Sequence, residues 1–270
     1  MGTGLRFVPG EHDLVLVTLD TLRFDVAEVA LREGRTPFLA SMLPGGRWEE
    51  RHSPASFTLA AHQAFLAGFL PTPATPGRHE RLFAMRFAGS ETTGPHTCVL
   101  DAPDIATGLA ALGYHTVCIG GTGFFDERAP LGRVIPSLFR ERHWSRELGV
   151  TEPRSTENQI AIAKEILHAR KERVFLLLNV SAIHQPNRFY LAGASEDSLA
   201  SHCAALTYVD SQLPGLFQAI RRRAPALVVL TSDHGTAYGE DGYSGHRVGH
   251  RVVWTVPYAE LLLGPEGVAT

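Results

Sequence analysis

The stretch Leu14-Val-Leu-Val-Thr-Leu19 is a continuous apolar run, rich in β-branched residues, that ends at Asp20. Such runs form strands buried on both faces, as in parallel sheets covered by helices. Further expected strands cover residues 97–100, 115–119, 174–180, 227–231 and 256–263, and expected helices cover residues 22–31, 36–42, 58–66, 103–112, 156–171 and 195–223. This alternation predicts an α/β fold: a doubly wound, mostly parallel sheet with helices on both faces.

The length and composition indicate one globular domain over residues 1–270. A chain of 270 residues with 44% hydrophobic and 20% charged residues can bury a substantial core. No repeat or linker divides it. Residues 120–153 are irregular and rich in Gly, Pro, Arg and aromatic residues, which predicts an insertion that shapes substrate specificity. Its arginines suggest an anionic substrate, and a solvated amphipathic loop is the plainer alternative.

The charge balance excludes some classes of partner. A net charge of -3 and a pI near 6.5 give no long-range attraction for polyanions, so we expect no general nucleic-acid binding and no membrane association. The run Arg221-Arg222-Arg223 is interpreted as a solvated helix cap rather than a phosphate-binding patch. No membrane-spanning stretch and no signal-peptide pattern are present, so a cytoplasmic location is expected.

Polar side chains follow three of the expected strands. Asp20 follows the first strand, His184 follows residues 174–180, and Asp233-His234 follows residues 227–231. Ligands of open α/β sheets bind at the carboxyl ends of the strands, so these side chains should lie close together. Taken singly, Asp20 could cap the next helix and Asp233 could stabilise a turn. Two carboxylates at matching strand ends would repel without a cation, and a carboxylate beside an imidazole suits zinc or manganese.

The order of these motifs resembles the sulfatase-like, phosphodiesterase-like branch of the alkaline phosphatase superfamily. The resemblance extends from about residue 13 to residue 263 and covers five segments: residues 14–25, Thr36-Pro37-Phe-Leu39, residues 57–68, Tyr208-Val-Asp210 and residues 231–257. It implies an alkaline phosphatase-like core and a metal-dependent hydrolase or transferase. The implied substrate is a small anionic phosphate ester, either a monoester or a diester.

The resemblance also implies a role for individual residues. Thr58, ten residues before Gly68 at the start of a helix, corresponds to the nucleophile. His184 corresponds to a catalytic histidine that either ligates a metal or touches the transferred group, and His246 to a catalytic residue on the substrate side. One zinc or manganese ion is expected, and a second is possible although Val180 stands where two-metal members carry an aspartate. The implied metal ligands are Asp20, Thr58, Asp233, His234 and His250.

Two alternative functions remain open at this stage. Sulfatases carry Cys-x-Pro-Ser-Arg where this chain has Thr58-Leu-Ala-Ala-His62, which argues against sulfate hydrolysis through formylglycine. A sulfate- or phosphonate-ester hydrolase is nevertheless one alternative, and a catalytically inactive metal-binding partner protein is the other. His62 could assist the nucleophile or cap its helix. Arg23 is predicted to pair with Asp25, and Asp210 to serve packing.

Overall fold

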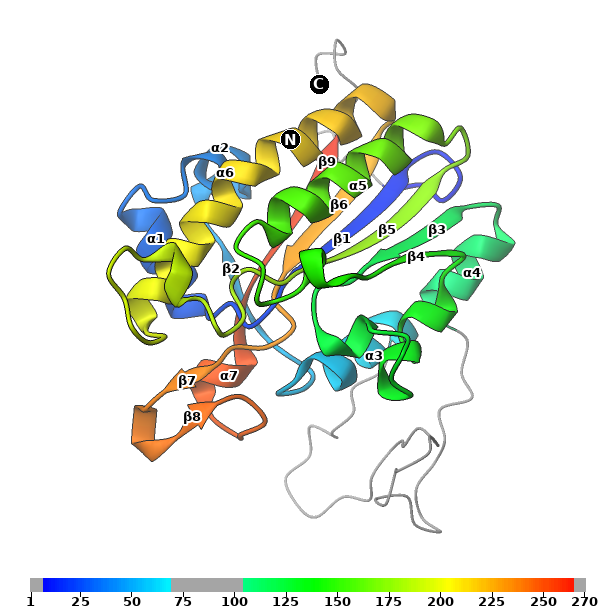
Figure 1. Cartoon of the computed structure of the whole chain (residues 1–270). Coiled ribbons are helices and arrows are strands. Elements are labelled where there is room, and N and C mark those ends of the chain that lie inside the picture. Colours follow the sequence, from blue (N-terminus) through cyan, green and yellow to red (C-terminus); the bar gives the residue numbers. More distant parts are fainter. Residues whose placement is uncertain (1–6, 69–103, 265–270) are drawn as a thin grey trace, which may run out of the picture.

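A seven-stranded sheet forms the centre of the computed structural model, which describes residues 7–68 and 104–264 (Figure 1). The strand order is β2-β9-β6-β1-β5-β3-β4. The strands are β1 (Asp13–Leu19), β2 (Glu49–His52), β3 (His115–Ile119), β4 (Glu141–His143), β5 (Val174–Val180), β6 (Ala226–Thr231) and β9 (Thr255–Leu263). β1 pairs in parallel with β5 and β6, β3 pairs in parallel with β4 and β5, and β9 is antiparallel to both β6 and β2. The predicted fold class is confirmed.

Helices cover both faces of this sheet. One apolar core joins the sheet to four helices, and a second core lies on the opposite face with two helices and part of the segment that follows β3. The first face carries α1 (Phe24–Arg32), α2 (Pro37–Met42), α5 (Ser155–Ala169) and α6 (Leu199–Arg223); the second carries α3 (Thr58–Ala67) and α4 (Ile105–Ala111). β5 is buried along its whole length, as its continuous apolar run predicts.

Two edge strands were not predicted. β2 reads Glu-Glu-Arg-His and β4 reads Glu-Arg-His, so neither carries the apolar pattern of a buried strand. Both lie at the outer edges of the sheet, where charged residues discourage pairing with other chains. The strand expected at residues 97–100 lies outside the described residues.

The side chain of Asp210 on α6 fixes the start of α2. The Asp210 carboxylate accepts hydrogen bonds from the Phe38 and Leu39 amides at 3.1 and 2.8 Å. These amides lie in the first turn of α2, where backbone N–H groups have no partner within the helix. Asp210 therefore joins α6 to α2, which agrees with its predicted structural role.

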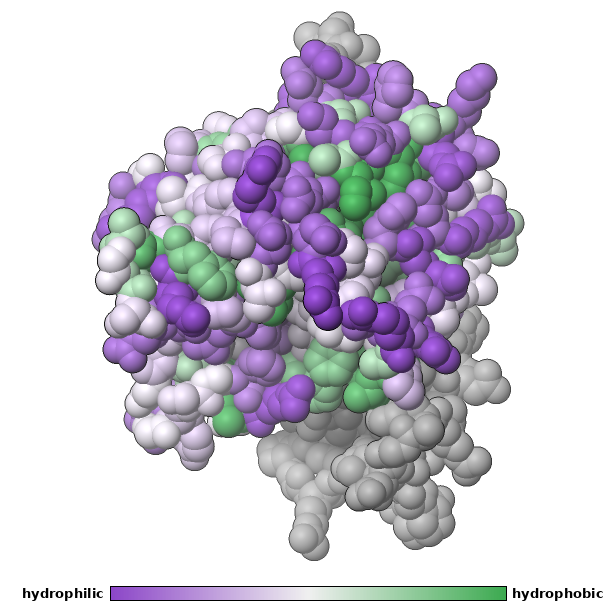
Figure 2. All heavy atoms as spheres, in the orientation of Figure 1, coloured by the Kyte–Doolittle hydropathy of each residue, from purple (hydrophilic) through white to green (hydrophobic). Residues whose placement is uncertain are grey.

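Hydrophilic side chains cover most of the face of the molecule that Figure 2 shows, with small apolar areas between them. Within residues 7–68 and 104–264, none of the helices combines the length and the apolar character that crossing a membrane requires. The cellular location expected from the sequence stays a prediction.

Candidate active site

Four predicted site residues meet at the carboxyl edge of the sheet. Asp20 follows β1, Asp233 and His234 follow β6, and all three side chains are fully buried. One ligand atom of each lies within 4.8 Å of the others, the one such group found in the described part of the chain. Thr58, the first residue of α3, places its Oγ1 3.5 Å from Asp20 Oδ2 and 3.3 Å from His234 Nε2.

The side chains of this cluster fit a divalent cation. Asp20 Oδ1 and Asp233 Oδ2 are buried and have no hydrogen-bond partner within the described ranges. Burial raises the pKa of Asp233 to about 7, and burial together with the charge of Asp233 raises the pKa of Asp20. Two facing buried carboxylates are costly unless a positive charge lies between them. Carboxylate oxygens, an imidazole nitrogen and a hydroxyl match the ligands that zinc accepts.

Neighbouring groups orient each candidate ligand. Asn179 Nδ2 donates to Asp20 Oδ2 at 2.9 Å, and the Thr21 amide donates to Asp233 Oδ1 at 3.2 Å. His234 Nδ1 donates to the Gly235 carbonyl at 2.8 Å, so Nε2 is the nitrogen with a free lone pair. Burial lowers the pKa of His234, which favours the neutral ring that binds metals. Such outer contacts fix ligand geometry in metal sites.

Two backbone features position the carboxylates. Thr21 has φ 63°, a left-handed conformation that β-branched residues rarely adopt, and this turn brings its amide to Asp233. α1 begins only at Phe24, with Arg23 as its N-cap, so Asp20 does not cap that helix. A Cβ on Gly235 would lie 2.0 Å from the Val252 carbonyl oxygen. Glycine is therefore required after His234 by a close backbone approach.

A buried hydrogen-bond chain links Asp20 to the backbone of Thr58 through His62. Asn179 Nδ2 donates to Thr18 Oγ1 at 3.2 Å, and Thr18 Oγ1 lies 3.0 Å from His62 Nε2. His62 Nδ1 lies 2.8 Å from the Thr58 carbonyl oxygen, which can only accept, so Nδ1 carries the proton and Nε2 accepts from Thr18. Burial lowers the pKa of His62 to about 4, which keeps this ring neutral. Thr18 and Asn179 were not among the site residues that the sequence predicts.

We expect His62→Leu to lower kcat of the reaction at this site by about 10- to 100-fold, because the carbonyl of Thr58 loses the donor that orients it. His62→Gln should recover most of this loss, since one amide can donate to Thr58 and accept from Thr18. Steady-state kinetics on both variants, with zinc content measured in parallel, separates positioning from loss of metal. Equal activity in the leucine variant and the parent would show that His62 only fills space.

His184 and His246 extend the cluster toward half-buried positions. The ring centroid of His246 lies 4.7 Å from that of His234 and 5.4 Å from that of His184. Burial, then the neighbouring imidazoles, lowers the pKa of His246 to about 3, so this ring is neutral. His184 Nδ1 donates to the Gln185 carbonyl, which leaves Nε2 free. The structure thus brings both predicted catalytic histidines next to the four buried residues.

His250 does not join the other predicted ligands. Its Nε2 lies 3.0 Å from Asp241 Oδ2, and its Nδ1 accepts a hydrogen bond from the Val252 amide at the start of α7 (Arg251–Trp254). Both ring nitrogens are therefore used in capping this short helix and pairing with the neighbouring loop. The second metal that His250 would serve gains no support from this geometry.

A buried polar network holds the segment that follows His184. Asn187 Nδ2 lies 2.9 Å from the Tyr238 hydroxyl, which lies 3.0 Å from His202 Nδ1 on α6. Ser201 Oγ donates to Asn187 Oδ1 at 2.6 Å. His202 is fully buried, and burial, reinforced by the charge of Arg23, lowers its pKa to about 3. The loop beside the active site is thus tied to a helix by a neutral histidine.

His202 should make folding sensitive to acid. Its folded pKa of about 3 lies below the ordinary value of 6.5, so the unfolded chain binds the proton first and stability falls as pH drops below 6.5. From pH 7 to pH 5 the loss through this group is about 2 kcal/mol. Urea titrations of parent and His202→Gln, both with chelator, should show a shallower pH dependence in the variant. Identical slopes would contradict the assignment.

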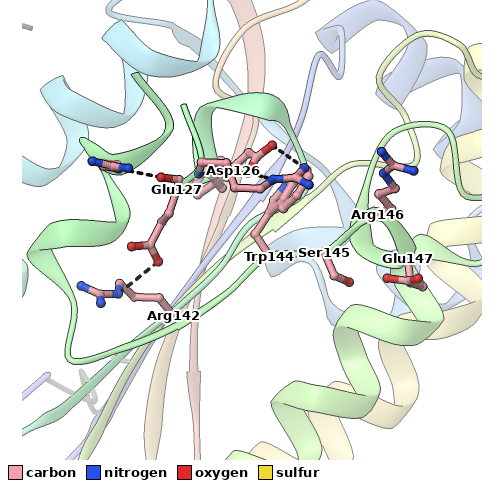
Figure 3. Close-up of a pocket in the computed structure, with 10 residues that line it drawn as sticks. Asp126, Glu127, Arg142, Trp144, Ser145, Arg146 and Glu147 are labelled. Atoms are coloured by element: carbon pink, nitrogen blue, oxygen red, sulfur yellow. Dashed lines mark hydrogen bonds and ion pairs between the residues drawn. The ribbon is translucent and has the colours of Figure 1, made fainter. Parts of the chain in front are cut away.

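The segment between β3 and α5 forms a pocket of about 570 Å³ beside the active site (Figure 3). Phe125 lines this pocket, and its ring packs edge-on against His62 at 5.6 Å. In Figure 3 Arg142 points to Glu127, at 3.2 Å, and Arg146 stands apart from that pair. Arg128 pairs with Asp126, which also lines the pocket, and its guanidinium group lies over the Trp144 ring. Acids thus offset much of the positive charge that suggested an anionic substrate.

The fold, this site and the family model that matches the chain indicate an enzyme of the phosphoryl- or sulfuryl-transfer kind. The family model named Sulfatase matches residues 12–258, so the chain belongs to the sulfatase family. No match was found among curated protein sequences.

Solved structures show the same fold at low identity. The soluble domain of lipooligosaccharide phosphoethanolamine transferase A from Neisseria meningitidis is similar with a TM-score of 0.64 and 14% identity, over 94% of this chain and 77% of that one. The C-terminal periplasmic domain of EptC from Escherichia coli, in complex with zinc, is similar with a TM-score of 0.66 and 13% identity. The match covers 94% of this chain and 73% of that one. Lipoteichoic acid synthase LtaP from Listeria monocytogenes is similar with a TM-score of 0.61 and 14% identity. The match covers 97% of this chain and 67% of that one.

Proposed function

We propose that this protein is a zinc-dependent phosphoric ester hydrolase or phosphotransferase that uses Thr58 as its nucleophile. The observation that carries the proposal is the hydroxyl of Thr58, held at the start of α3 within 3.5 Å of Asp20 and His234, beside carboxylate oxygens that lack partners. The names of the similar structures, two phosphoethanolamine transferases and a lipoteichoic acid synthase, support phosphate-ester chemistry.

Asp20, Thr58, Asp233 and His234 would hold the cation. A divalent cation supplies positive charge that lowers the pKa of a hydroxyl and offsets negative charge on the transferred group. The Thr58 oxygen attacks phosphorus in line with the leaving oxygen, and the new P–O bond forms as the old one breaks. The first amides of α3 can donate to the non-bridging oxygens, since helix N-terminal amides have no partner within the helix.

The half-buried histidines handle the protons. His184 or His246 takes the proton of the Thr58 hydroxyl and delivers it to the leaving oxygen, and the same ring then removes one from the incoming group. Attack of water on the phosphothreonine completes hydrolysis, whereas attack of an alcohol completes transfer. The complete set of buried side chains favours this chemistry over the inactive partner protein.

Four substrates with one leaving group test the proposal: bis(p-nitrophenyl) phosphate, p-nitrophenyl phosphate, p-nitrophenyl phenylphosphonate and p-nitrophenyl sulfate. Protein stripped with a chelator is assayed before and after addition of zinc or manganese. We expect zinc to restore activity, and a phosphate ester to be the fastest substrate. Fastest turnover of the sulfate or phosphonate would support that alternative instead. Bound zinc without turnover of any ester would support the inactive metal-binding protein.

A further inference from the structure

A basic pocket lies at the end of the sheet opposite the active site. The hollow of about 570 Å³ is formed by α5, α6 and the loop after α5, and these two helices pack side by side (Figure 1). The pocket adjoins Asp13, the first residue of β1, through Arg223, whereas Asp20 follows the other end of this strand. Seven residues of extended chain separate the two sites by about 23 Å.

The charge of this pocket departs from that of the whole chain. Six of the 25 Lys and Arg residues line it, and none of its lining residues is acidic. Because the chain carries a net charge of -3, the rest of the molecule carries -9. The six cationic residues are Lys164, Arg170, Lys171, Arg173, Arg222 and Arg223.

Three arginines form the wall of the pocket and are held in place. Arg223 Nε lies 2.7 Å from the buried carboxylate of Asp13, and Arg173 lies 3.7 Å from the same group. Arg170 lies 2.7 Å from Glu141. Their positions are therefore fixed by contacts within the protein. Two acids, Asp13 and Glu141, offset part of this charge.

The two lysines have no such partner. Lys164 and Lys171 are the only lysines in the whole sequence, and both line this pocket. Neither ammonium group makes a hydrogen bond or an ion pair with the residues that the structure describes. A Cβ on Gly215 would lie 3.9 Å from Lys164 Cδ, so the stem of Lys164 crosses from α5 to α6.

Helix capping accounts for only part of this charge. α5 ends at Ala169 and α6 ends at Arg223, and cations near helix C-termini interact favourably with the helix dipoles. Lys164 lies more than a turn before the end of α5, and Lys171 and Arg173 lie beyond it. Two ammonium groups and three anchored guanidinium groups line the same pocket, and together they match the multiple acceptors of a phosphate-bearing anion.

We propose that this pocket binds a multiply charged phosphate-bearing anion through Lys164 and Lys171. Such an anion can be a soluble phosphate compound or the head group of an anionic phospholipid, since both present the same charged oxygens. The site is separate from the reacting centre, so binding there regulates or localises the enzyme without taking part in turnover.

Amine acetylation measures occupancy of the pocket directly, because the chain offers only two lysines and its α-amino group. Protein is treated with sulfo-N-hydroxysuccinimide acetate, and peptides are quantified by mass spectrometry. One arm contains inorganic pyrophosphate, and another contains phosphatidylglycerol vesicles with phosphatidylcholine vesicles as reference. Sodium chloride at matched ionic strength is the common control. We expect Lys164 and Lys171 to react at least about fivefold more slowly with one of the anions, and the α-amino group to be unaffected.

The two arms identify the source of the anion. Protection by pyrophosphate alone assigns a soluble ligand, protection by phosphatidylglycerol alone assigns a lipid, and protection by both supports the shared chemistry. Lys164→Gln with Lys171→Gln should weaken binding by at least about tenfold in a fluorescence or calorimetric titration. Lys164→Arg with Lys171→Arg should retain it. Arg32→Gln with Arg35→Gln, both exposed and outside the pocket, removes the same charge and should leave binding intact. Unprotected lysines in both arms, or undiminished binding by the glutamine pair, would overturn the proposal.

Discussion

Thr58→Ala should reduce turnover of phosphate esters by about 10⁴- to 10⁶-fold, the scale of loss when a catalytic residue is removed from an otherwise intact site. The hydroxyl lies at the first residue of α3, between Asp20 and His234. Alanine keeps the helix and removes only the attacking oxygen and one weak ligand. Steady-state kinetics on bis(p-nitrophenyl) phosphate, with fluorescence-monitored melting as the folding control, measures the effect.

Thr58→Ser supplies the matched control, since it keeps the hydroxyl and loses only a methyl group. We expect this variant to retain turnover within about tenfold of the parent, whereas both variants should hold zinc near the parental content. Mass spectrometry of protein quenched during turnover should detect phosphate on residue 58 of the parent and none on the alanine variant. Full activity without the hydroxyl would remove Thr58 from the mechanism and leave a direct attack by water.

The core of the fold could be predicted because a strand that is buried on both faces appears in the sequence as a continuous apolar run. β1 and β5 are continuous apolar runs, and both lie in the middle of the sheet. The polar residues directly after such runs were then placed at one edge by topology alone. The order of the strands thus predicts that Asp20, Asp233 and His234 lie together, and the structure places one ligand atom of each within 4.8 Å of the others.

The supporting residues of the site were harder to find. Thr18 and Asn179 lie inside strands that look wholly apolar, and each carries one polar group that bonds across the sheet. A buried polar residue near the end of a core strand was the available signal. His250 was placed by resemblance of its spacing to a family motif. Its side chain instead caps a short helix, a local interaction that spacing does not report.

Net charge concealed the basic pocket. The sequence was read as offering no attraction for polyanions, since -3 is an average over the whole chain. Folding brings Lys164, Lys171 and four arginines from two segments to one hollow, and none of the residues that line it is acidic. The run at residues 221–223 looked like a helix cap when considered alone, and Arg223 does anchor to Asp13 at the end of α6. Its neighbours in space come from a segment fifty residues earlier.

Asp233→Asn should abolish zinc binding and yet stabilise the metal-free protein. The folded pKa of Asp233 is raised by burial to about 7 from an ordinary value of 3.8. The unfolded carboxyl loses its proton first, so the metal-free protein loses stability as pH rises from about 4 and reaches a plateau above 7. The difference between the folded and the unfolded pKa of Asp233 sets an upper bound of about 4 kcal/mol for the stability that the metal-free protein loses when this carboxyl ionises.

Asparagine removes the charge while keeping the shape and the existing hydrogen bonds. Its Oδ1 can still accept from the Thr21 and His234 amides, as Asp233 Oδ1 does at 3.2 and 3.0 Å. Its Nδ2 replaces an oxygen that has no partner and lies 3.6 Å from His234 Nε2, which can accept. In chelator at pH 8 the variant should therefore unfold at higher urea concentration than the parent, by about 2 kcal/mol.

Zinc should reverse the order of stability. Binding to the folded parent adds about 4 kcal/mol when free zinc is 1,000 times the dissociation constant, whereas the variant lacks a ligand and gains little. Urea titrations of both proteins, each with chelator and with zinc, give the four free energies of unfolding needed for the comparison. Elemental analysis measures the bound zinc. If Asp233 were an ordinary structural residue, the substitution would lower the free energy of unfolding both with chelator and with zinc. A variant that is more stable than the parent in chelator and less stable in zinc is therefore specific to a cation site. A variant less stable than the parent in chelator would mean that the Asp233 carboxylate stabilises the metal-free fold, and the cation would then not be what this cluster requires.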